Sequence, residues 1–375
     1  MNIDKLPFFC GVGDIDNNSL PKTLPFSLGV NESNGLIIQL PNKEVEKALN
    51  DAYSKEGLFL TIPIDESLIT KWRGDEFIDV IENKVDLDVN GKTVLDIGCS
   101  TGYILHNLKN KGGLVKGLEP GPSAQTARER YGLDVDRSFF NPSLFNQQFD
   151  VVIHLTLLEH IQDPVSFLKQ TKSILKKGGL TILGVPDCEE QIHVGDIGMV
   201  LHEHWSYFTQ ESLSNVLKQA GFSTLGFFRS KKGVLYAWGY NNDVEEPIEN
   251  VDSVSKLRKY NEKIEKVLDN MQKWMDSSKN KSIGLYGASL GASYLLSLLD
   301  WSNVKVNIYD GDTNKKGKYL PGCSFPIQSS TDLLKDNPES ILIIPVNFSE
   351  EILRYLKCDL SINKEIEIKT LSDFN

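Results

Sequence analysis

The chain has 375 residues, of which 40% are apolar and 24% charged, and its 51 acidic against 40 basic side chains give a formal net charge of −11. This composition supports real hydrophobic cores and excludes wholesale disorder, and the length suggests two or three domains. The acidic excess argues against non-specific binding to nucleic acid, which needs a basic face. It is compatible with an anionic small substrate held at one basic site.

No apolar run is long enough to span a bilayer, and residues 1–14 lack the apolar core of a secretory signal. We therefore expect a cytoplasmic protein with neither a membrane nor a nucleic acid as partner; its oligomeric state stays open. The cysteines are odd in number, lie far apart and show no C-x-x-C spacing, which favours free thiols in a reducing compartment. They are Cys10, Cys99, Cys188, Cys323 and Cys358.

The predicted elements fall into three segments. Residues 1–90 begin with a loop-rich stretch and continue with helical patterns at about 43–54 and 66–84. Residues 91–240 alternate β-rich runs with helical stretches, which is typical of a parallel α/β sheet. The β-rich runs are Thr93–Ile97, Leu114–Leu118, Phe149–Leu155, Leu180–Val185, Ser223–Phe228 and Val234–Trp238.

A turn-forming acidic stretch at 241–247 marks a boundary before the third segment. A long amphipathic helix is predicted over about 253–277, and a second α/β unit follows it. Its strand candidates are Ser282–Tyr286, Lys305–Tyr309, Ser340–Pro345 and Ile366–Lys369.

The first α/β unit opens with a strand, a glycine loop and a helix. Gly98 and Gly102 let the backbone approach a ligand closely, and the following helix offers free N–H groups to an anion. Asp96, at the end of the strand, can accept a hydrogen bond from an ammonium group or a water molecule. Glu119 ends the next strand, where a carboxylate usually binds two ribose hydroxyls. These residue types together predict a pocket for a nucleoside cofactor.

The spacing Asp96-x-Gly98-x-x-x-Gly102 differs from a dinucleotide fingerprint and resembles motif I of the Rossmann-like S-adenosylmethionine methyltransferases. Residues 149–154, 157–164 and 176–179 are similar to later parts of that family, in the same order. The resemblance implies S-adenosylmethionine as cofactor; another glycine-bearing α/β domain is the alternative. The implied cofactor-binding residues are Asp96, Gly98, Cys99, Ser100, Gly102, Tyr103, Glu119, Pro120 and His154.

A second group of polar residues, His202-Glu203-His204, lies between the fifth strand of this unit and a predicted helix. Close neighbours of this kind tune an imidazole towards neutral pH, so we predict His204 as general base with Glu203 orienting it or acting with it. His202 and Tyr207 are predicted to contact the substrate.

Two other interpretations of this segment stay open. It can be a helix-capping loop, and we expect His160, at a family-like helix entry, to be structural as well. It can also be a metal site, because His202 and His204 of an extended segment project to one side. The nearest third ligands in sequence are His193 and Asp196.

The run from His202 to Phe208 further resembles the sugar C-methyltransferases that act on deoxyhexose nucleotides. Residues 284–288 and 309–322 are similar to the C-terminal domain of that family. The resemblance implies an α/β fold with a mostly parallel seven-stranded sheet over 91–240, a substrate-capping segment over 1–90 and a second Rossmann-like domain over 253–375. It implies a nucleotide-linked keto-deoxysugar as the small-molecule partner.

Two departures from that family matter. Its members usually begin with a zinc knuckle of two C-x-x-C pairs. Here Gly13 occupies the position of the second cysteine in the first pair, which begins at Cys10, and Asn31 and Asn34 replace the second pair. Because zinc needs thiolate or imidazole ligands, we expect no zinc and no other metal. Leu201 stands where the family often has tyrosine, which makes a sugar O-methyltransferase the alternative. A non-catalytic S-adenosylmethionine-binding protein and a metal-dependent hydrolase are further alternatives.

The run Gly287-Ala288-Ser289-Leu290-Gly291 matches the G-x-S-x-G pattern of a hydrolase nucleophile. Such a hydrolase needs its histidine after the serine, and all six histidines lie at or before position 204. We therefore interpret the run as a strand-to-helix turn in the second α/β unit.

Overall fold

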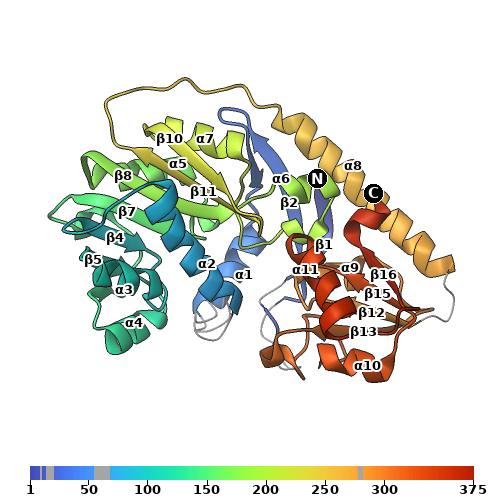
Figure 1. Ribbon diagram of the computed structural model, residues 1–375. Coiled ribbons are helices and arrows are strands. Elements are labelled where there is room, and N and C mark those ends of the chain that lie inside the picture. The colour runs from blue at the N-terminus through green and yellow to red at the C-terminus, as the bar shows by residue number, and fades with distance from the viewer. Residues whose placement is uncertain (9–10, 14–20, 55–67, 278–281) are drawn as a thin grey trace.

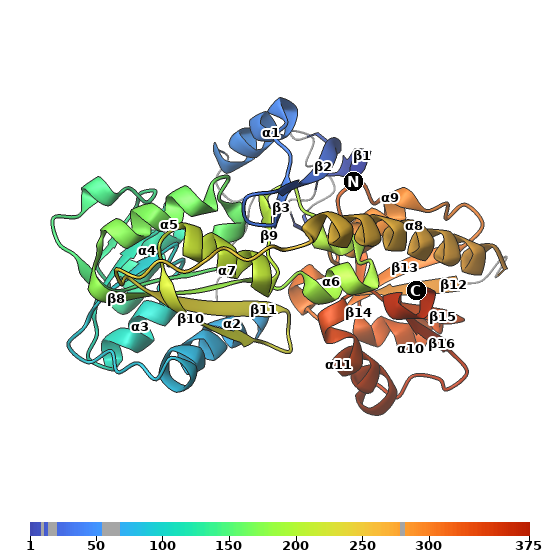
Figure 2. The same cartoon turned by 90° about the horizontal axis from the view of Figure 1, so that it is seen from above.

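The computed structural model describes residues 1–8, 11–13, 21–54, 68–277 and 282–375. They form two α/β units side by side, with a small antiparallel sheet between them (Figures 1 and 2). The long helix α8 (Ser253–Ser277), predicted with these bounds, runs along the second unit and packs against the small sheet.

The first unit is a seven-stranded sheet in the order β10-β11-β8-β7-β4-β5-β6, which confirms the predicted mostly parallel sheet. Only β10 and β11 run antiparallel to their neighbours. The strands are β4 (Thr93–Ile97), β5 (Leu114–Leu118), β6 (Val135–Asp136), β7 (Phe149–Leu155), β8 (Leu175–Pro186), β10 (Ser223–Arg229) and β11 (Val234–Tyr240). The helices of this unit are α2 (Leu68–Asp79), α3 (Tyr103–Asn110), α4 (Ser123–Tyr131), α5 (Pro164–Ser173) and α7 (Gln210–Gln219), whereas α6 (Glu189–Val194) follows β8 and packs against α8.

The central strands are mostly apolar because both faces of the sheet are covered. Leu95 and Val152 join a core that includes residues of α5 and α7, whereas Val94 and Val151 pack on the opposite face. Helix α2 lies on that opposite face, where Phe77 is fully buried. The predicted helix over 66–84 therefore packs on the sheet, and it changes to a π-helical turn, η2 (Val80–Lys84), after Asp79.

The second unit is a five-stranded, all-parallel sheet in the order β14-β13-β12-β15-β16, which confirms a second α/β domain. The G-x-S-x-G run is the turn between β12 and α9, as expected from the sequence. The elements are β12 (Ser282–Tyr286), α9 (Leu290–Leu298), β13 (Lys305–Asp310), β14 (Ile327–Ser329), α10 (Leu333–Asp336), β15 (Ser340–Ile343), α11 (Ser349–Arg354) and β16 (Glu367–Thr370).

The expectation of a loop-rich start is wrong for the described N-terminal residues, which supply three strands of a four-stranded antiparallel sheet in the order β1-β2-β3-β9. Leu24, Phe26 and Leu28 alternate into its core, with Pro25 and Gly29 on the other face. The strands are β1 (Asn2–Pro7), β2 (Thr23–Asn31), β3 (Leu36–Gln39) and β9 (Ser206–Tyr207), and α1 (Lys43–Ser54) follows β3 with the predicted bounds. The segment with the two histidines thus supplies the edge strand β9.

Asparagine side chains close the turn between β2 and β3. Asn31 Oδ1 accepts a hydrogen bond from the Ser33 N–H (3.0 Å), and Asn34 Oδ1 accepts one from the Leu36 N–H (3.0 Å). The turn that would carry the second pair of zinc ligands is therefore held by hydrogen bonds. Cys10 lies outside the described residues, and the absence of zinc stays a prediction.

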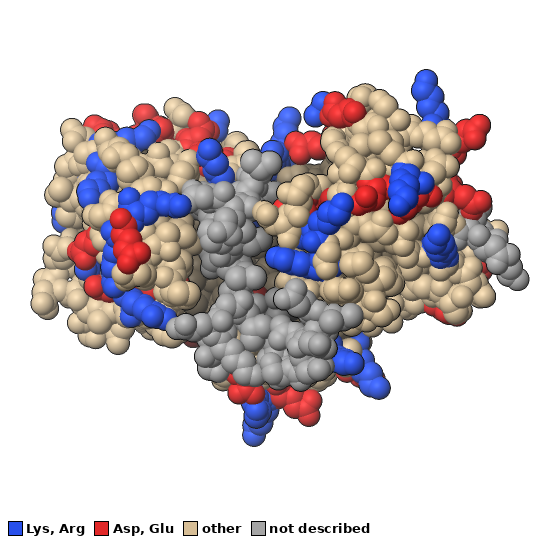
Figure 3. Space-filling view, turned by 90° about the horizontal axis from the view of Figure 1, so that it is seen from below, with Lys and Arg blue, Asp and Glu red and all other residues tan. Residues whose placement is uncertain are grey.

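Charges of both signs are spread over the surface. On the face shown in Figure 3, Lys and Arg side chains alternate with Asp and Glu over both units. None of the described helices combines the length and the apolar character needed to cross a bilayer.

Candidate active site

In the glycine loop between β4 and α3, two glycines have a left-handed backbone conformation. Gly98 and Gly102 have φ angles of +79° and +81°, in the left-handed region that favours glycine. A Cβ at Gly102 would lie 2.5 Å from Leu133 Cδ1, so the loop could not pack as it does with a larger residue. The Gly98 and Cys99 N–H groups donate to the Leu118 carbonyl (2.8 and 3.0 Å), which fixes the loop to the end of β5.

Glu119 lies against the same loop. Its Oε2 accepts a hydrogen bond from the Ser100 N–H (3.0 Å), and its Oε1 accepts one from the Gly121 N–H (2.7 Å). Ser100 Oγ is buried and has no hydrogen-bond partner among the described residues. The structure thus brings the predicted ribose-binding carboxylate to the glycine loop, beside a hydroxyl whose hydrogen bonds are unused.

Asp96 is buried at the end of β4, with 2% of its surface exposed. Burial, and then the charge of Glu119, raise the pKa of its carboxyl to about 8. No positive charge in the described part of the chain offsets these effects. A ligand ammonium group would supply the missing charge, so this pair of carboxylates fits the cofactor that the sequence predicts.

Three other predicted cofactor residues take different positions. The Cys99 side chain packs in a small core with Leu105, and burial raises the pKa of its thiol, so only its backbone is available at the loop. The Tyr103 hydroxyl donates to Asp75 of α2, a bond that raises the tyrosine pKa to about 12. Pro120 is exposed beside Glu119.

The structure does not bring the His154 side chain to the glycine loop. Its ring is fully buried and packs edge-on against Phe167 of α5, with 5.5 Å between the ring centroids. Burial lowers the pKa of its imidazole to about 3. The prediction that His154 binds the cofactor is therefore corrected to a place in the core beneath the sheet.

The two neighbouring histidines point in different directions. The His204 N–H donates to the Leu201 carbonyl (2.9 Å), and this turn breaks the extended geometry expected from the sequence. The His202 ring lies between Phe8 and Phe26, at centroid distances of 5.5 and 5.4 Å, and is 1% exposed. The prediction that His202 contacts the substrate is therefore wrong.

Tyr207 is also buried rather than open to a substrate. Its hydroxyl donates to the Leu201 carbonyl (3.0 Å) and accepts from the Leu201 N–H (3.1 Å). Burial raises the pKa of this hydroxyl well above its usual range. Tyr207 holds the turn that carries His204, and its predicted contact with the substrate is corrected accordingly.

His204 lies in a polar cluster formed with the short helix η4 (Leu158–His160). The His160 and His204 rings meet edge to face, with 4.8 Å between centroids. His160 Nδ1 is 3.2 Å from the Glu203 carbonyl, and the Trp205 N–H donates to the Glu159 carbonyl (2.7 Å). Burial, His160 and the charge of Arg73 hold the pKa of His204 well below 6.5, so its imidazole is neutral at physiological pH.

Sequence reasoning missed two charged residues of this cluster. Glu159 is 2% exposed, and burial raises the pKa of its carboxyl to about 8. Arg73 reaches the cluster from α2, and burial lowers its pKa. In the sequence, only the spacing of Arg73 and Glu76 along one face of α2 could have indicated that α2 contributes to the cluster, because Arg73 and Glu159 are far apart along the chain.

Glu159, His160 and His204 are also the group that could hold a metal ion, since their ligand atoms lie within 4.8 Å of one another. The alternative ligands His193 and Asp196 do not join them in any group found among the described residues. The positive charge of Arg73 acts on both Glu159 and His204 and disfavours a dication there.

The glycine loop and the histidine cluster meet at one edge of the sheet. Leu157, which precedes η4, packs over the loop, so that a Cβ added to Gly98 would lie 3.6 Å from its Cδ1. Both groups follow the carboxyl ends of parallel strands, β4 and β7, where ligands bind in open α/β sheets. The arrangement can hold a nucleoside cofactor beside a neutral base.

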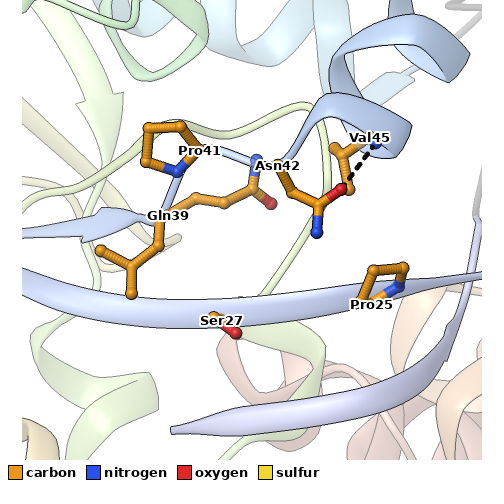
Figure 4. Close-up of a pocket in the computed structure, with 7 residues that line it drawn as sticks. Pro25, Ser27, Gln39, Pro41, Asn42 and Val45 are labelled. Atoms are coloured by element: carbon orange, nitrogen blue, oxygen red, sulfur yellow. Dashed lines mark hydrogen bonds between the residues drawn. The ribbon is translucent and has the colours of Figure 1, made fainter.

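A separate pocket lies between β2, β3 and α1 (Figure 4). The side chains of Gln39 and Asn42 point into it, and the Gln39 amide donates to the His202 carbonyl (3.0 Å). Gln39 therefore joins the lining of this pocket to the segment that carries the histidines.

Comparisons with known families agree with this geometry. Residues 69–225 match the family described as "Methyltransferase domain", and residues 243–361 match "C-methyltransferase C-terminal domain". The first match covers α2 and most of the seven-stranded sheet, and the second begins after β11.

Similar curated proteins carry several names. A ubiquinone biosynthesis O-methyltransferase of Ruegeria sp. (strain TM1040) is 28% identical over 181 residues, which are 42% of this chain and 72% of that protein. A protein of the same name from Ruegeria pomeroyi is 27% identical, and the match spans only 64% of its length. A tRNA U34 carboxymethyltransferase of Alteromonas mediterranea is 27% identical over 56% of this chain and 69% of its own.

Solved structures are similar at lower identity. A magnesium protoporphyrin IX methyltransferase from Synechocystis PCC 6803 with bound SAH shows 16% identity and a TM-score of 0.37, over 46% of this chain and 87% of its own. The assignment comes from the two family matches together with the sequence relatives. The chain is an S-adenosylmethionine-dependent methyltransferase, and its residues 243–361 are similar to a C-methyltransferase C-terminal domain.

Proposed function

We propose that the enzyme methylates a carbon atom next to the carbonyl of a nucleotide-linked keto-deoxysugar. The family matched at residues 243–361 supports C-methylation by its name, and the resemblance of residues 202–208 to sugar C-methyltransferases supports the sugar. The observation that carries the proposal is the position of His204, whose ring contacts that of His160 at the same edge of the sheet as the glycine loop, where a base can accept the proton that C-methylation removes.

The cofactor is held by residues of the glycine loop in this proposal. Asp96 and Glu119 would bind its ammonium and ribose hydroxyl groups, and the backbone of residues 98–102 would lie against it. When bound, S-adenosylmethionine supplies an electrophilic methyl group. The orphaned Ser100 hydroxyl and the uncompensated carboxyl of Asp96 support this assignment.

His204 acts as the general base and accepts the proton from the acceptor carbon. His160 packs edge-on against its ring and, through the Glu203 carbonyl, belongs to the same hydrogen-bonded turn. His160 is therefore a positioning residue. Glu203, predicted to orient or assist the base, contributes its backbone carbonyl to that turn.

A sugar O-methyltransferase is the second candidate. The Ruegeria relatives are named as O-methyltransferases, although their similarity is confined to about two fifths of this chain. His204 would then accept a hydroxyl proton, and the acceptor would need no carbonyl group.

The test is a methyl-transfer assay with paired acceptors, namely 4-keto-6-deoxy nucleotide sugars and the same sugars reduced to alcohols. Formation of S-adenosylhomocysteine with the ketones only, and a new carbon–carbon bond in the product, supports C-methylation. Product formed only with the alcohols would overturn it in favour of the O-methyltransferase.

A substitution tests the base. His204→Ala is expected to lower turnover by roughly 10²- to 10⁴-fold, the usual contribution of a general base, and to leave S-adenosylhomocysteine affinity unchanged. His193→Ala removes an exposed imidazole outside the cluster and is the matched control. Full activity of His204→Ala would remove His204 from its role.

A further inference from the structure

We propose that Arg73 binds the oxyanion that forms on the acceptor carbonyl when His204 removes the neighbouring proton, which makes Arg73 a second catalytic residue. The inference rests on the proposed function and deepens it. It assigns a chemical task to α2, a helix that contributes no residue to the predicted cofactor or base site.

The first observation is a pair of unsatisfied polar atoms. Arg73 Nε and Glu159 Oε2 are both buried, and neither has a hydrogen-bond partner in the described part of the chain. The two groups interact through their charges, but no ion pair between them is found there. Leaving a buried donor and a buried acceptor unpaired costs free energy, and a polar ligand atom between them would remove that cost.

The second observation is that the acidic neighbours of Arg73 on α2 are engaged elsewhere. The Glu76 carboxylate accepts hydrogen bonds from Ser230 Oγ (2.9 Å) and Tyr236 Oη (2.8 Å), at the hairpin of β10 and β11. Asp75 accepts one from the Tyr103 hydroxyl. The carboxylates nearest in sequence are thus bound by other elements, and the guanidinium keeps donors for a ligand.

The third observation places the charge of Arg73 on the side of the base. Glu159 links the two residues, because a ligand atom of its carboxylate lies within 4.8 Å of a ring nitrogen of His204. The charge of Arg73 acts on both Glu159 and His204. An anion attracted by Arg73 would therefore form next to His204.

The chemistry of the step needs such a cation. His204 takes a proton from the carbon beside the carbonyl, the C–H electron pair forms a C=C bond, and the carbonyl π pair moves to oxygen. Arg73 donates hydrogen bonds to that oxygen. The carbonyl then reforms as the carbon bonds the methyl group, the carbon–sulfur bond breaks with its pair on sulfur, and His204 releases its proton to water. Donors aimed at developing charge contribute most in sites that exclude water.

The experiment compares Arg73→Gln and Arg73→Lys with Lys71→Gln, which removes an exposed positive charge from the same helix. The assay measures kcat and KM on a 4-keto-6-deoxy nucleotide sugar at saturating cofactor. Calorimetry measures S-adenosylhomocysteine affinity and checks folding. We expect Arg73→Gln to lower kcat by roughly 10²- to 10³-fold with cofactor affinity within twofold. Arg73→Lys should recover part of the rate, and Lys71→Gln should match the wild type.

A second readout follows the first half of the reaction. With S-adenosylhomocysteine bound, exchange of the acidic hydrogen of the ketosugar for deuterium from solvent reports enolate formation. Arg73→Gln should slow this exchange as much as it slows turnover. Arg73→Met, which has a side chain as long as that of glutamine but places no polar group in the buried site, replaces the glutamine variant where the latter does not fold.

Two results would overturn the proposal. One is an Arg73→Gln enzyme with wild-type kcat and exchange rate. The other is a loss of S-adenosylhomocysteine affinity of tenfold or more with kcat preserved, which would assign the guanidinium to the cofactor carboxylate. Failure of the proposed function looks different, because the wild-type enzyme would then methylate alcohols and leave every ketone unchanged.

Discussion

The two α/β units hold their glycine turns in the same way but differ in how they balance the carboxylate that does so. In the first unit, Glu119 accepts backbone N–H groups of Ser100 and Gly121. In the second, Asp310 accepts the N–H groups of Ala288 (2.8 Å) and Asp312 (2.8 Å). Both carboxylates follow the second strand of their sheet and close the turn after the first.

The difference lies in the neighbouring charge. The Lys315 ammonium is 2.9 Å from Asp310 Oδ2 and also donates to the Ala288 carbonyl (3.1 Å). In the first unit, Asp96 adds a second carboxylate next to Glu119, with no compensating cation in the described chain. A buried carboxyl that the protein leaves without a cation indicates a place for a positively charged ligand group, whereas the ion pair of Asp310 with Lys315 indicates a structural role.

The largest expected effect is on cofactor affinity, and it should distinguish Glu119 of the first unit from Asp310 of the second. Glu119→Gln should weaken S-adenosylhomocysteine binding by roughly 30- to 100-fold, about 2–3 kcal/mol, because hydrogen bonds to a charged acceptor are lost. Asp310→Asn should leave this affinity unchanged. Calorimetry on both variants is the measurement. Equal losses in the two variants would show that the contrast between the units is mistaken.

The pH dependence of cofactor binding tests Asp96. Its carboxyl has a pKa of about 8 in the free protein, so it is mostly protonated at pH 7. An ammonium-bearing ligand prefers the ionised form, so affinity for S-adenosylhomocysteine should rise by roughly tenfold per pH unit up to pH 8 and then level off. Asp96→Asn should remove this dependence. A flat profile for the wild type would contradict the role of Asp96.

Because Lys315 balances the charge of Asp310 in the second unit, its removal should change the stability of the protein and leave cofactor affinity unaffected. Lys315→Met leaves the largely buried Asp310 without its cation and should lower the free energy of unfolding by about 1–2 kcal/mol. Urea denaturation measures it, with the exposed Lys318→Met as control. Cofactor affinity should stay at the wild-type value; a change in it would link the second unit to the cofactor site.

The smallest effect concerns Tyr103, which the sequence assigns to the cofactor and the structure joins to Asp75. Tyr103→Phe should cost about 0.5–1 kcal/mol of stability and change S-adenosylhomocysteine affinity by less than twofold. Thermal unfolding and calorimetry check the two values. A marked loss of affinity would restore the contact that the sequence predicts.

Much of the fold could be predicted because its signals are local. Strands such as Thr93–Ile97 are continuous apolar runs between turns, and the helix over 253–277 repeats apolar residues at helical spacing. The N-terminal sheet was missed because Pro25 and Gly29, residue types that are depleted in strands, favour a loop, although Leu24, Phe26 and Leu28 alternate along β2. Strand β9 has two residues and exists only through its pairing with β3.

The residues of the candidate site likewise fall into those that local sequence signals predict and those that depend on tertiary contacts. Asp96 and Glu119 could be placed because Asp96 lies near the end of β4 and Glu119 directly follows β5, and both strand ends can be predicted from the sequence. The different orientations of His202 and His204 depend on one backbone hydrogen bond to Leu201, which residue types do not reveal. Arg73 and Glu159 come together from α2 and η4 through tertiary packing, without a local pattern.

The pairing of β9 with β3 makes the histidine segment part of the N-terminal sheet. Ile37 and Ile38 pair with Tyr207 and Ser206, and the Gln39 N–H donates to the Trp205 carbonyl (3.0 Å). Exchange of the N-terminal strands between such enzymes would therefore also change the support of the segment that carries the proposed base. A methyltransferase domain excised without these strands should lose the pairing that holds this segment in place.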